Sequence, residues 1–169
     1  MLKLIERLGP IAADHASDTL TLPYERRVLG RLRATSDTGR ELGLFLDRGP
    51  VLHDGEGLRA ESGEIVRVRA ADEPVVTARI APGLPLARLA YHLGNRHVQL
   101  ALGEDEKGGY VRFSPDHVLE ELAELLGATL ERHVAPFDPE PGAYNQLGHS
   151  HAHDHEHSHH HAHGHHHAH

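Results

Sequence analysis

The hydrophobic pattern of this 169-residue chain changes its period near Glu73, and no other feature limits the fold as much. Before this point, short apolar or alternating segments are separated by turn-forming residues, which is typical of a small all-β module. After it, extended segments alternate with segments of helical period. We therefore expect an α+β protein with a small all-β domain over 1–73, a second domain over 74–137, and a linker and tail over 138–169.

The first segment contains short predicted strands separated by turns. Alternation is clearest in the last strand, where Val66 and Val68 alternate with Arg67 and Arg69, so that one face is expected to be dry and the other wet. The predicted strands are Lys3–Leu8, Thr19–Pro23, Val28–Ala34, Glu41–Leu46 and Glu64–Ala70, with turns at 36–39, 47–50 and 54–57.

The second segment predicts the order strand, helix, strand, strand, helix, strand, which is the ferredoxin-like βαββαβ arrangement. A strand over Val75–Ala81 leads to a helix that Pro85 opens, because a proline at the first helical position loses no hydrogen bond. Gly94 is expected to end this helix as a left-handed C-cap. Its apolar stripe consists of Leu86, Leu89, Ala90 and Leu93.

A second helix is expected to have Ser114 as its N-cap and Pro115 at its first position, and to end at Gly127. Its buried face is expected to contain Val118 or Leu119, Leu122, Leu125 and Leu126. The remaining strands are predicted at Arg96–Ala101, Tyr110–Phe113 and Thr129–Ala135, with a polar loop at Gly103–Gly109.

The last segment, His149–His169, carries thirteen of the nineteen histidines in a largely alternating pattern. An imidazole with a pKa near 6.5 is mostly neutral at cytosolic pH and offers a free nitrogen to a divalent metal. A purification tag is the alternative, but tags are usually uninterrupted runs and this tail is spaced by other residues. Because alanine is its only apolar residue type, we expect the tail to be disordered without metal.

Composition and charge exclude several classes of function. The chain has no cysteine, which leaves only nitrogen and oxygen ligands for a metal. Its net charge of −8 disfavours a nucleic-acid partner. Glu6 and Arg7 interrupt the apolar start, and no apolar run reaches transmembrane length, so we expect a soluble cytoplasmic protein without a membrane partner. No metallohydrolase motif or paired-carboxylate site appears, so an enzyme is not expected.

Two stretches resemble the urease accessory protein E family of nickel metallochaperones: Tyr91–Leu100, with its Leu-Gly-Asn-Arg-His sequence, and Ala135–Tyr144 before the histidine-rich tail. Asp47–Leu52 and Gly63–Val68 are similar to the first domain of that family. The resemblance implies a peptide-binding type of first domain and a ferredoxin-like second domain. It also implies a homodimer that binds nickel, exchanges it with a partner GTPase and supports nickel insertion into apo-urease, without being an enzyme itself.

The resemblance assigns His97 first, because this residue matches the interfacial metal-binding histidine of the family. A two-fold axis places the same residue of two copies face to face, so that two His97 side chains can bind one ion. Without the resemblance, a single histidine after a helix-to-strand turn would more often be structural or merely exposed.

Two imidazoles leave a nickel ion short of a complete shell, so water or further ligands must fill the open positions. His149 and His151 are the nearest candidates along the chain, followed by His153 and the rest of the tail as a multi-site collector. Nitrogen and oxygen ligands suit nickel, copper and zinc, so nickel is named by the resemblance alone, and zinc or copper binding in vitro is expected beside it.

The remaining histidines are weaker candidates. His117 matches the second of two family histidines, but Pro115 stands in the first position, so His117 can equally be a surface helix residue. His15, His53 and His133 are expected to be ordinary surface or strand residues.

The alternative function is a histidine-rich nickel or zinc store in which the tail binds all the metal and the folded part is a scaffold. His97 separates the two, because delivery needs a defined site on the folded dimer.

Overall fold

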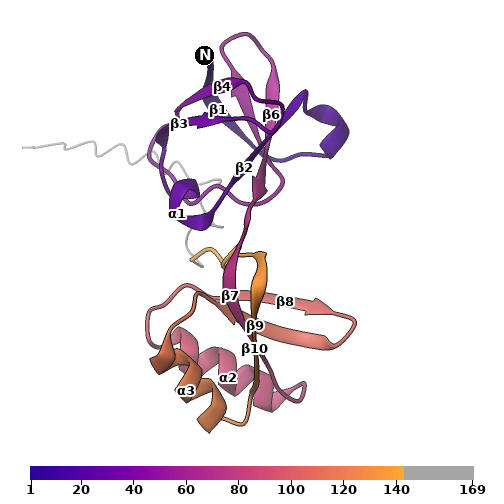
Figure 1. The fold of residues 1–169 in the computed structure, drawn as a ribbon, viewed down its shortest axis with the longest axis vertical. Coiled ribbons are helices and arrows are strands. Elements are labelled where there is room, and N and C mark those ends of the chain that lie inside the picture. Colours follow the sequence, from indigo (N-terminus) through magenta and orange to yellow (C-terminus); the bar gives the residue numbers. More distant parts are fainter. Residues whose placement is uncertain (143–169) are drawn as a thin grey trace, which may run out of the picture.

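The computed structural model describes residues 1–142, which form a strand-rich first domain and a mixed α/β second domain joined at a narrow waist (Figure 1). The expected disorder and metal binding of the histidine-rich tail concern residues 143–169, which lie outside the described residues.

A six-stranded sheet in the order β2-β6-β5-β1-β4-β3 forms the first domain. Its leucines and valines form one buried cluster, which includes Leu4, Leu44 and Val68. The sheet is mixed, because β1 pairs in parallel with β4, and β2 with β6. The elements are β1 (Leu2–Pro10), η1 (Ala13–His15), β2 (Asp18–Leu22), α1 (Tyr24–Arg27), β3 (Arg31–Thr35), β4 (Glu41–Phe45), β5 (Glu56–Ala60) and β6 (Ile65–Ala70).

Two expectations for this domain are wrong. The turn expected at 54–57 is partly occupied by β5, which sequence alternation does not indicate because Glu56, Gly57 and Leu58 are all buried. A Cβ atom on Gly57 would lie 2.8 Å from Ile11, so this strand needs a glycine, which is rare in strand interiors. The strand expected from Val28 begins only at Arg31, because the short helix α1 precedes it.

The second domain has a four-stranded antiparallel sheet in the order β10-β7-β9-β8, with both helices packed against one face (Figure 1). Val76, Val111 and Phe113 of the sheet and Leu89 and Leu93 of α2 are fully buried between the layers. The predicted order of strands and helices is confirmed. The elements are β7 (Asp72–Arg79), α2 (Leu84–Gly94), β8 (Ala101–Asp105), β9 (Gly108–Phe113), α3 (His117–Leu125) and β10 (Thr129–Pro136).

The strand expected at Arg96–Ala101 and the loop expected at Gly103–Gly109 are both displaced. β8 begins at Ala101 and forms a hairpin with β9 through most of the expected loop. Its charged residues suit an edge strand, where they oppose pairing with another chain. A Cβ atom on Gly103 would lie only 2.3 Å from the Tyr110 hydroxyl, so this glycine provides the space that the tyrosine ring occupies.

Helix α3 begins two residues later than expected. Asp116, and not Ser114, is its N-cap, because the Asp116 carboxylate accepts hydrogen bonds from the backbone N–H groups of Val118 and Leu119 at 2.9 and 3.1 Å. Gly127 follows the helix in the left-handed conformation with φ 93°, which confirms the expected end. Leu125, expected to be buried, is 85% exposed.

One extended segment joins the two domains, because β6 ends at Ala70 and β7 begins at Asp72. No loop therefore accompanies the change of period near Glu73, and Pro74 lies within β7 opposite Val134. No helix of residues 1–142 is long and apolar enough to cross a membrane.

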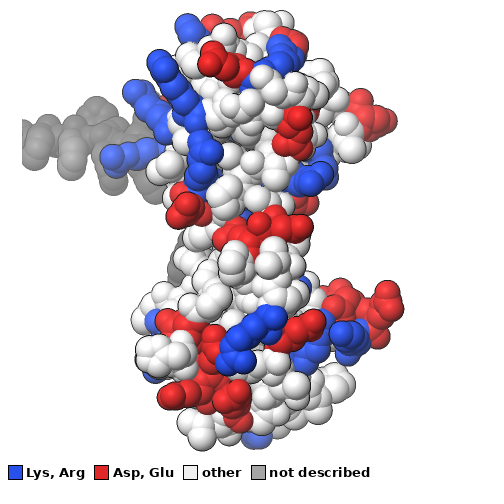
Figure 2. All heavy atoms as spheres, viewed as in Figure 1, with Lys and Arg blue, Asp and Glu red and all other residues white. Residues whose placement is uncertain are grey.

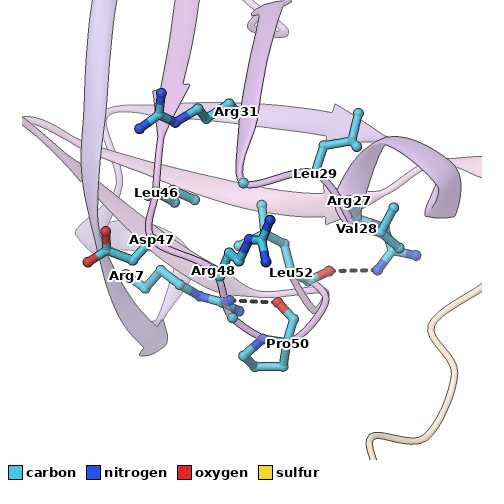
Figure 3. A pocket seen from close by; sticks show the side chains of 12 residues that line it. Arg7, Arg27, Val28, Leu29, Arg31, Leu46, Asp47, Arg48, Pro50 and Leu52 are labelled. Carbon is cyan, nitrogen blue, oxygen red and sulfur yellow. Dashed lines mark hydrogen bonds between the residues drawn. The ribbon is translucent and has the colours of Figure 1, made fainter.

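A buried arginine of the first domain binds the segment that follows β10, the last strand of the second domain. The Arg27 side chain is fully buried and donates a hydrogen bond to the Leu52 carbonyl at 2.8 Å (Figure 3). It donates another to the Asp138 carboxylate, also at 2.8 Å. It also donates to the backbone carbonyl of Phe137. The Asp138 carboxylate accepts a further hydrogen bond from the Asp54 N–H at 3.1 Å. These contacts fix the point at which the chain leaves the second domain.

Candidate metal site

His97 lies in a turn directly after α2 and is exposed. The helix ends with a right-handed C-cap at Asn95, so Gly94 is not the expected left-handed cap. His97 has a φ of 57° and is the only non-glycine residue of 1–142 with a positive φ. Histidine is among the side chains that visit this region more often, and such conformations are concentrated at functional sites. The backbone therefore holds the His97 side chain at the end of the helix in an uncommon geometry.

One copy of the described chain does not complete a metal site. Residues 1–142 contain no group of three or more His, Asp or Glu side chains that could hold an ion. Around His97, Tyr91, Asn95 and Arg96 are also exposed. A metal bound at His97 therefore needs ligands from a second copy, from water or from another segment of the chain.

The linker passes close to the segment that carries His97. The Glu140 N–H donates a hydrogen bond to the Leu100 carbonyl at 2.8 Å, and Leu100 follows His97 by three residues. His149 follows Glu140 by nine residues, which reach about 30 Å when extended. His149, His151 and His153 lie outside the described residues, and chain length permits them to approach His97. No sequence signal indicated the contact between Glu140 and Leu100.

His117 is the first residue of α3 and is exposed. The adjacent Asp116 carboxylate caps the helix, and His117 belongs to no group of three ligands among residues 1–142. The structure therefore assigns His117 no metal-binding partner in the described part of one chain.

Two other histidines have hydrogen-bond partners within the fold. His133 Nε2 lies 2.7 Å from the hydroxyl of buried Thr77, and His53 Nδ1 lies 3.0 Å from the Asp138 carboxylate. Both therefore have structural contacts, whereas His15 and His92 are exposed.

Figure 2 shows basic side chains gathered along one edge of the first domain, whereas acidic side chains gather at the waist and mix with basic ones over the second domain.

Comparison with known proteins places the chain among proteins that assist the maturation of another enzyme. Residues 4–71 match the model of the UreE urease accessory protein N-terminal domain, and residues 73–169 match that of the C-terminal domain. This chain belongs to the UreE family of urease accessory proteins.

Several curated relatives are similar over most of their length, and their name denotes an accessory protein and not an enzyme. Urease accessory protein UreE of Marinobacter nauticus is 64% identical over 159 residues, which cover 90% of this chain and 88% of the relative. The proteins of the same name from Pseudoalteromonas translucida and Alkalilimnicola ehrlichii are 61% and 53% identical, over 90% and 85% of this chain and 91% and 85% of the relatives. The chain therefore has a role in urease maturation.

Proposed function

We propose that this protein is a nickel metallochaperone that delivers nickel to apo-urease during urease maturation. Nickel is its cargo and not a resident cofactor, and the protein is not an enzyme. Membership of the UreE family supports a role in urease maturation. The observation that carries the site is His97, an exposed imidazole in a left-handed turn that belongs to no group of three potential ligands in the described part of one chain.

A homodimer supplies the second ligand in this proposal. A two-fold axis near His97 would bring two imidazoles to one ion at the junction of two ferredoxin-like domains. Tyr91, on the preceding helical turn, is 67% exposed, as an interface residue would be in an isolated copy. The two imidazoles hold the ion, and its remaining positions stay open for exchange.

The tail supplies further ligands in this proposal. His149 and His151 are the first candidates, followed by His153, because the linker contact at Glu140 starts the tail beside the His97 segment. His117 is a peripheral candidate. Neutral imidazoles also bind zinc and copper, so these metals would compete with nickel in vitro.

The partners in this proposal are a urease accessory GTPase and the apo-urease complex, in the cytoplasm. The first domain, of the peptide-binding type, offers a surface for such partners. A membrane or nucleic-acid partner is not part of the proposal.

Calorimetric titration with nickel tests the site most simply. In a chain that ends at Gly148, we expect about one ion per dimer, because two symmetry-related imidazoles form one site. His97→Ala should abolish this binding. His92→Ala, which removes an exposed imidazole from the helix that precedes His97, is the matched control and should retain this binding. Binding that survives His97→Ala would refute the assignment.

The second candidate function is a nickel or zinc store. The thirteen tail histidines favour it, because they can bind several ions without a defined site on the fold. A store depends on the tail and a delivery protein on His97, so the two functions differ in which change impairs urease activation more.

A further inference from the structure

A cleft of about 650 Å³ lies at the waist, between β6 of the first domain and the β8–β9 hairpin of the second. Arg67 and Arg69 of β6 line it from one side, and Tyr110 and Arg112 of β9 from the other. In Figure 1, β6 continues into β7 at this waist, and the hairpin lies beside β7. The volume is in the range of sites that bind small ligands.

The three arginines of this cleft have no acidic partner. None of them takes part in the ion pairs of residues 1–142. Arg112 donates hydrogen bonds to the Thr77 hydroxyl at 2.9 Å and to the Pro136 carbonyl at 3.0 Å, and both acceptors are neutral. Its guanidinium carbon lies 4.7 Å from the centre of the Tyr110 ring. Arg112 is therefore held in place while its charge stays without a counter-ion.

One donor nitrogen of Arg67 has no hydrogen-bond partner in the described part of the chain. Its Nε atom is buried and has no hydrogen-bond acceptor among residues 1–142. An unsatisfied buried donor destabilises the fold, and such groups usually pair with a water, an ion or a ligand. A Cβ atom on Gly55 would lie 3.1 Å from an Arg67 Nη atom, so the guanidinium packs closely over this glycine. The side chain is therefore positioned by the fold.

The other arginine-lined cavity differs in one respect. It lies in the first domain, has a volume of about 660 Å³ and is lined by Arg7, Arg27, Arg31 and Arg48. Figure 3 shows Arg7 and Arg27 directed at backbone carbonyls, and Arg7 also binds the Glu56 carboxylate at 2.6 and 2.9 Å. Arg31 and Arg48 take part in no ion pair of residues 1–142. Among the arginines that line the two cavities, only Arg67 has a buried nitrogen without an acceptor in the described part of the chain.

Three acidic residues also line the cleft and balance the formal charge of its three arginines. Asp138 is paired with Arg27, the Asp54 carboxylate accepts a hydrogen bond from the Ala70 N–H at 2.9 Å, and Asp72 is exposed. Attraction by net charge alone is therefore small. Recognition here rests on the directed N–H groups of guanidinium, which match the oxygens of phosphate and carboxylate groups.

We propose that the interdomain cleft binds a small oxyanion, a phosphate or a carboxylate compound, between Arg67 and Arg69 of the first domain and Arg112 of the second. The ligand accepts hydrogen bonds from the guanidinium groups of Arg67 and Arg69 and neutralises Arg112. Because the arginines that bind the anion come from both domains, the bound anion also links the two domains at the waist. The site is independent of His97 and of the metal.

The test is a calorimetric titration of the metal-free, full-length chain with phosphate, pyrophosphate and citrate at low ionic strength. A pH of about 8 keeps the tail imidazoles neutral, so that they do not attract the anions. We expect saturable binding of one anion per chain for at least one probe. Binding of phosphate or pyrophosphate but not citrate would assign the phosphate class, and the reverse would assign a carboxylate compound.

Arg69→Gln should weaken this binding by about tenfold or more, because it removes a charged donor from an exposed side chain without disturbing the core. The matched control is Arg88→Gln, which makes the same change at an exposed position of α2 outside the cleft and should leave affinity unchanged. Failure of all three probes to bind saturably would overturn the proposal. Equal weakening in both variants, or none in Arg69→Gln, would also overturn it.

Discussion

The Glu140 N–H donates a hydrogen bond to the Leu100 carbonyl at 2.8 Å, so the linker leaves the second domain beside the segment that carries His97. The His97 segment and the linker are therefore neighbours in the fold, although His97 and Glu140 are far apart in sequence. In the proposed function, this contact keeps tail imidazoles at a high local concentration near His97.

A chain that ends at Gly148 should remain folded and dimeric and should bind about one nickel ion per dimer. The described cores lie within residues 1–142, so removing the tail removes none of their contacts. Circular dichroism, light scattering and calorimetry measure fold, dimer and metal together. Unfolding of the shortened chain, or loss of all metal binding, would contradict the separation of site and tail.

The nickel capacity of the full chain should fall steeply between about pH 7.5 and about pH 5.5, because imidazoles with an ordinary pKa near 6.5 must lose a proton to bind metal. Equilibrium dialysis across this range measures the capacity. Binding dominated by the carboxylates of the tail would persist at the lower pH, and a flat profile would therefore exclude imidazole ligands.

Asp138→Asn should lower the free energy of unfolding by about 2 kcal/mol, because the buried Arg27 guanidinium loses its charged acceptor. Asp105→Asn is the matched control. It removes an exposed carboxylate that pairs with Arg79 and should lower the free energy of unfolding much less. Urea unfolding measures both, and equal effects would show that the Arg27 pair contributes no more than a surface pair.

Asp18 should give the protein part of its acid sensitivity. Burial raises the pKa of Asp18, but hydrogen bonds from Ser36, Thr38 and Thr19 outweigh this effect and hold the pKa below its ordinary value. The folded state therefore favours the carboxylate. Its stabilising contribution is complete above the unfolded-state pKa and is lost as the pH falls through the lower folded-state pKa.

Asp18→Asn should accordingly lower stability by about 1 to 2 kcal/mol near neutral pH and flatten the loss of stability below about pH 4. Asp14→Asn, which changes an exposed carboxylate, should leave both unchanged. Chemical unfolding at a series of pH values makes the comparison. If Asp18→Asn lost stability at acid pH as steeply as the unchanged protein, the role of this carboxylate would be contradicted.

The sequence predicted the order of elements in the second domain because helical periods and glycine stops are local signals. It misplaced β8, because Gly103, a residue that is rare in strand interiors, makes room there for the ring of Tyr110 on the paired strand. It missed β5 for a similar reason, since Gly57 contacts Ile11 from another segment.

At the candidate site, too, some features could be predicted from the sequence and others could not. The family resemblance identified His97 as a candidate ligand. The left-handed conformation that His97 adopts was expected at Gly94 instead. The contacts of Arg27 with Phe137 and Asp138 could not be predicted, because nothing in the sequence distinguishes this buried arginine from the exposed ones.

The central claim is that His97 forms the one site from which nickel is handed on, while the tail histidines are redundant. Urease activity in cells grown with limiting nickel tests it most directly, by comparing His97→Ala with a chain that ends at Gly148. We expect His97→Ala to lower urease activation more than removal of the tail, because a unique pair of ligands cannot be replaced. An equal or greater loss in the shortened chain would contradict delivery through His97 and favour storage by the tail.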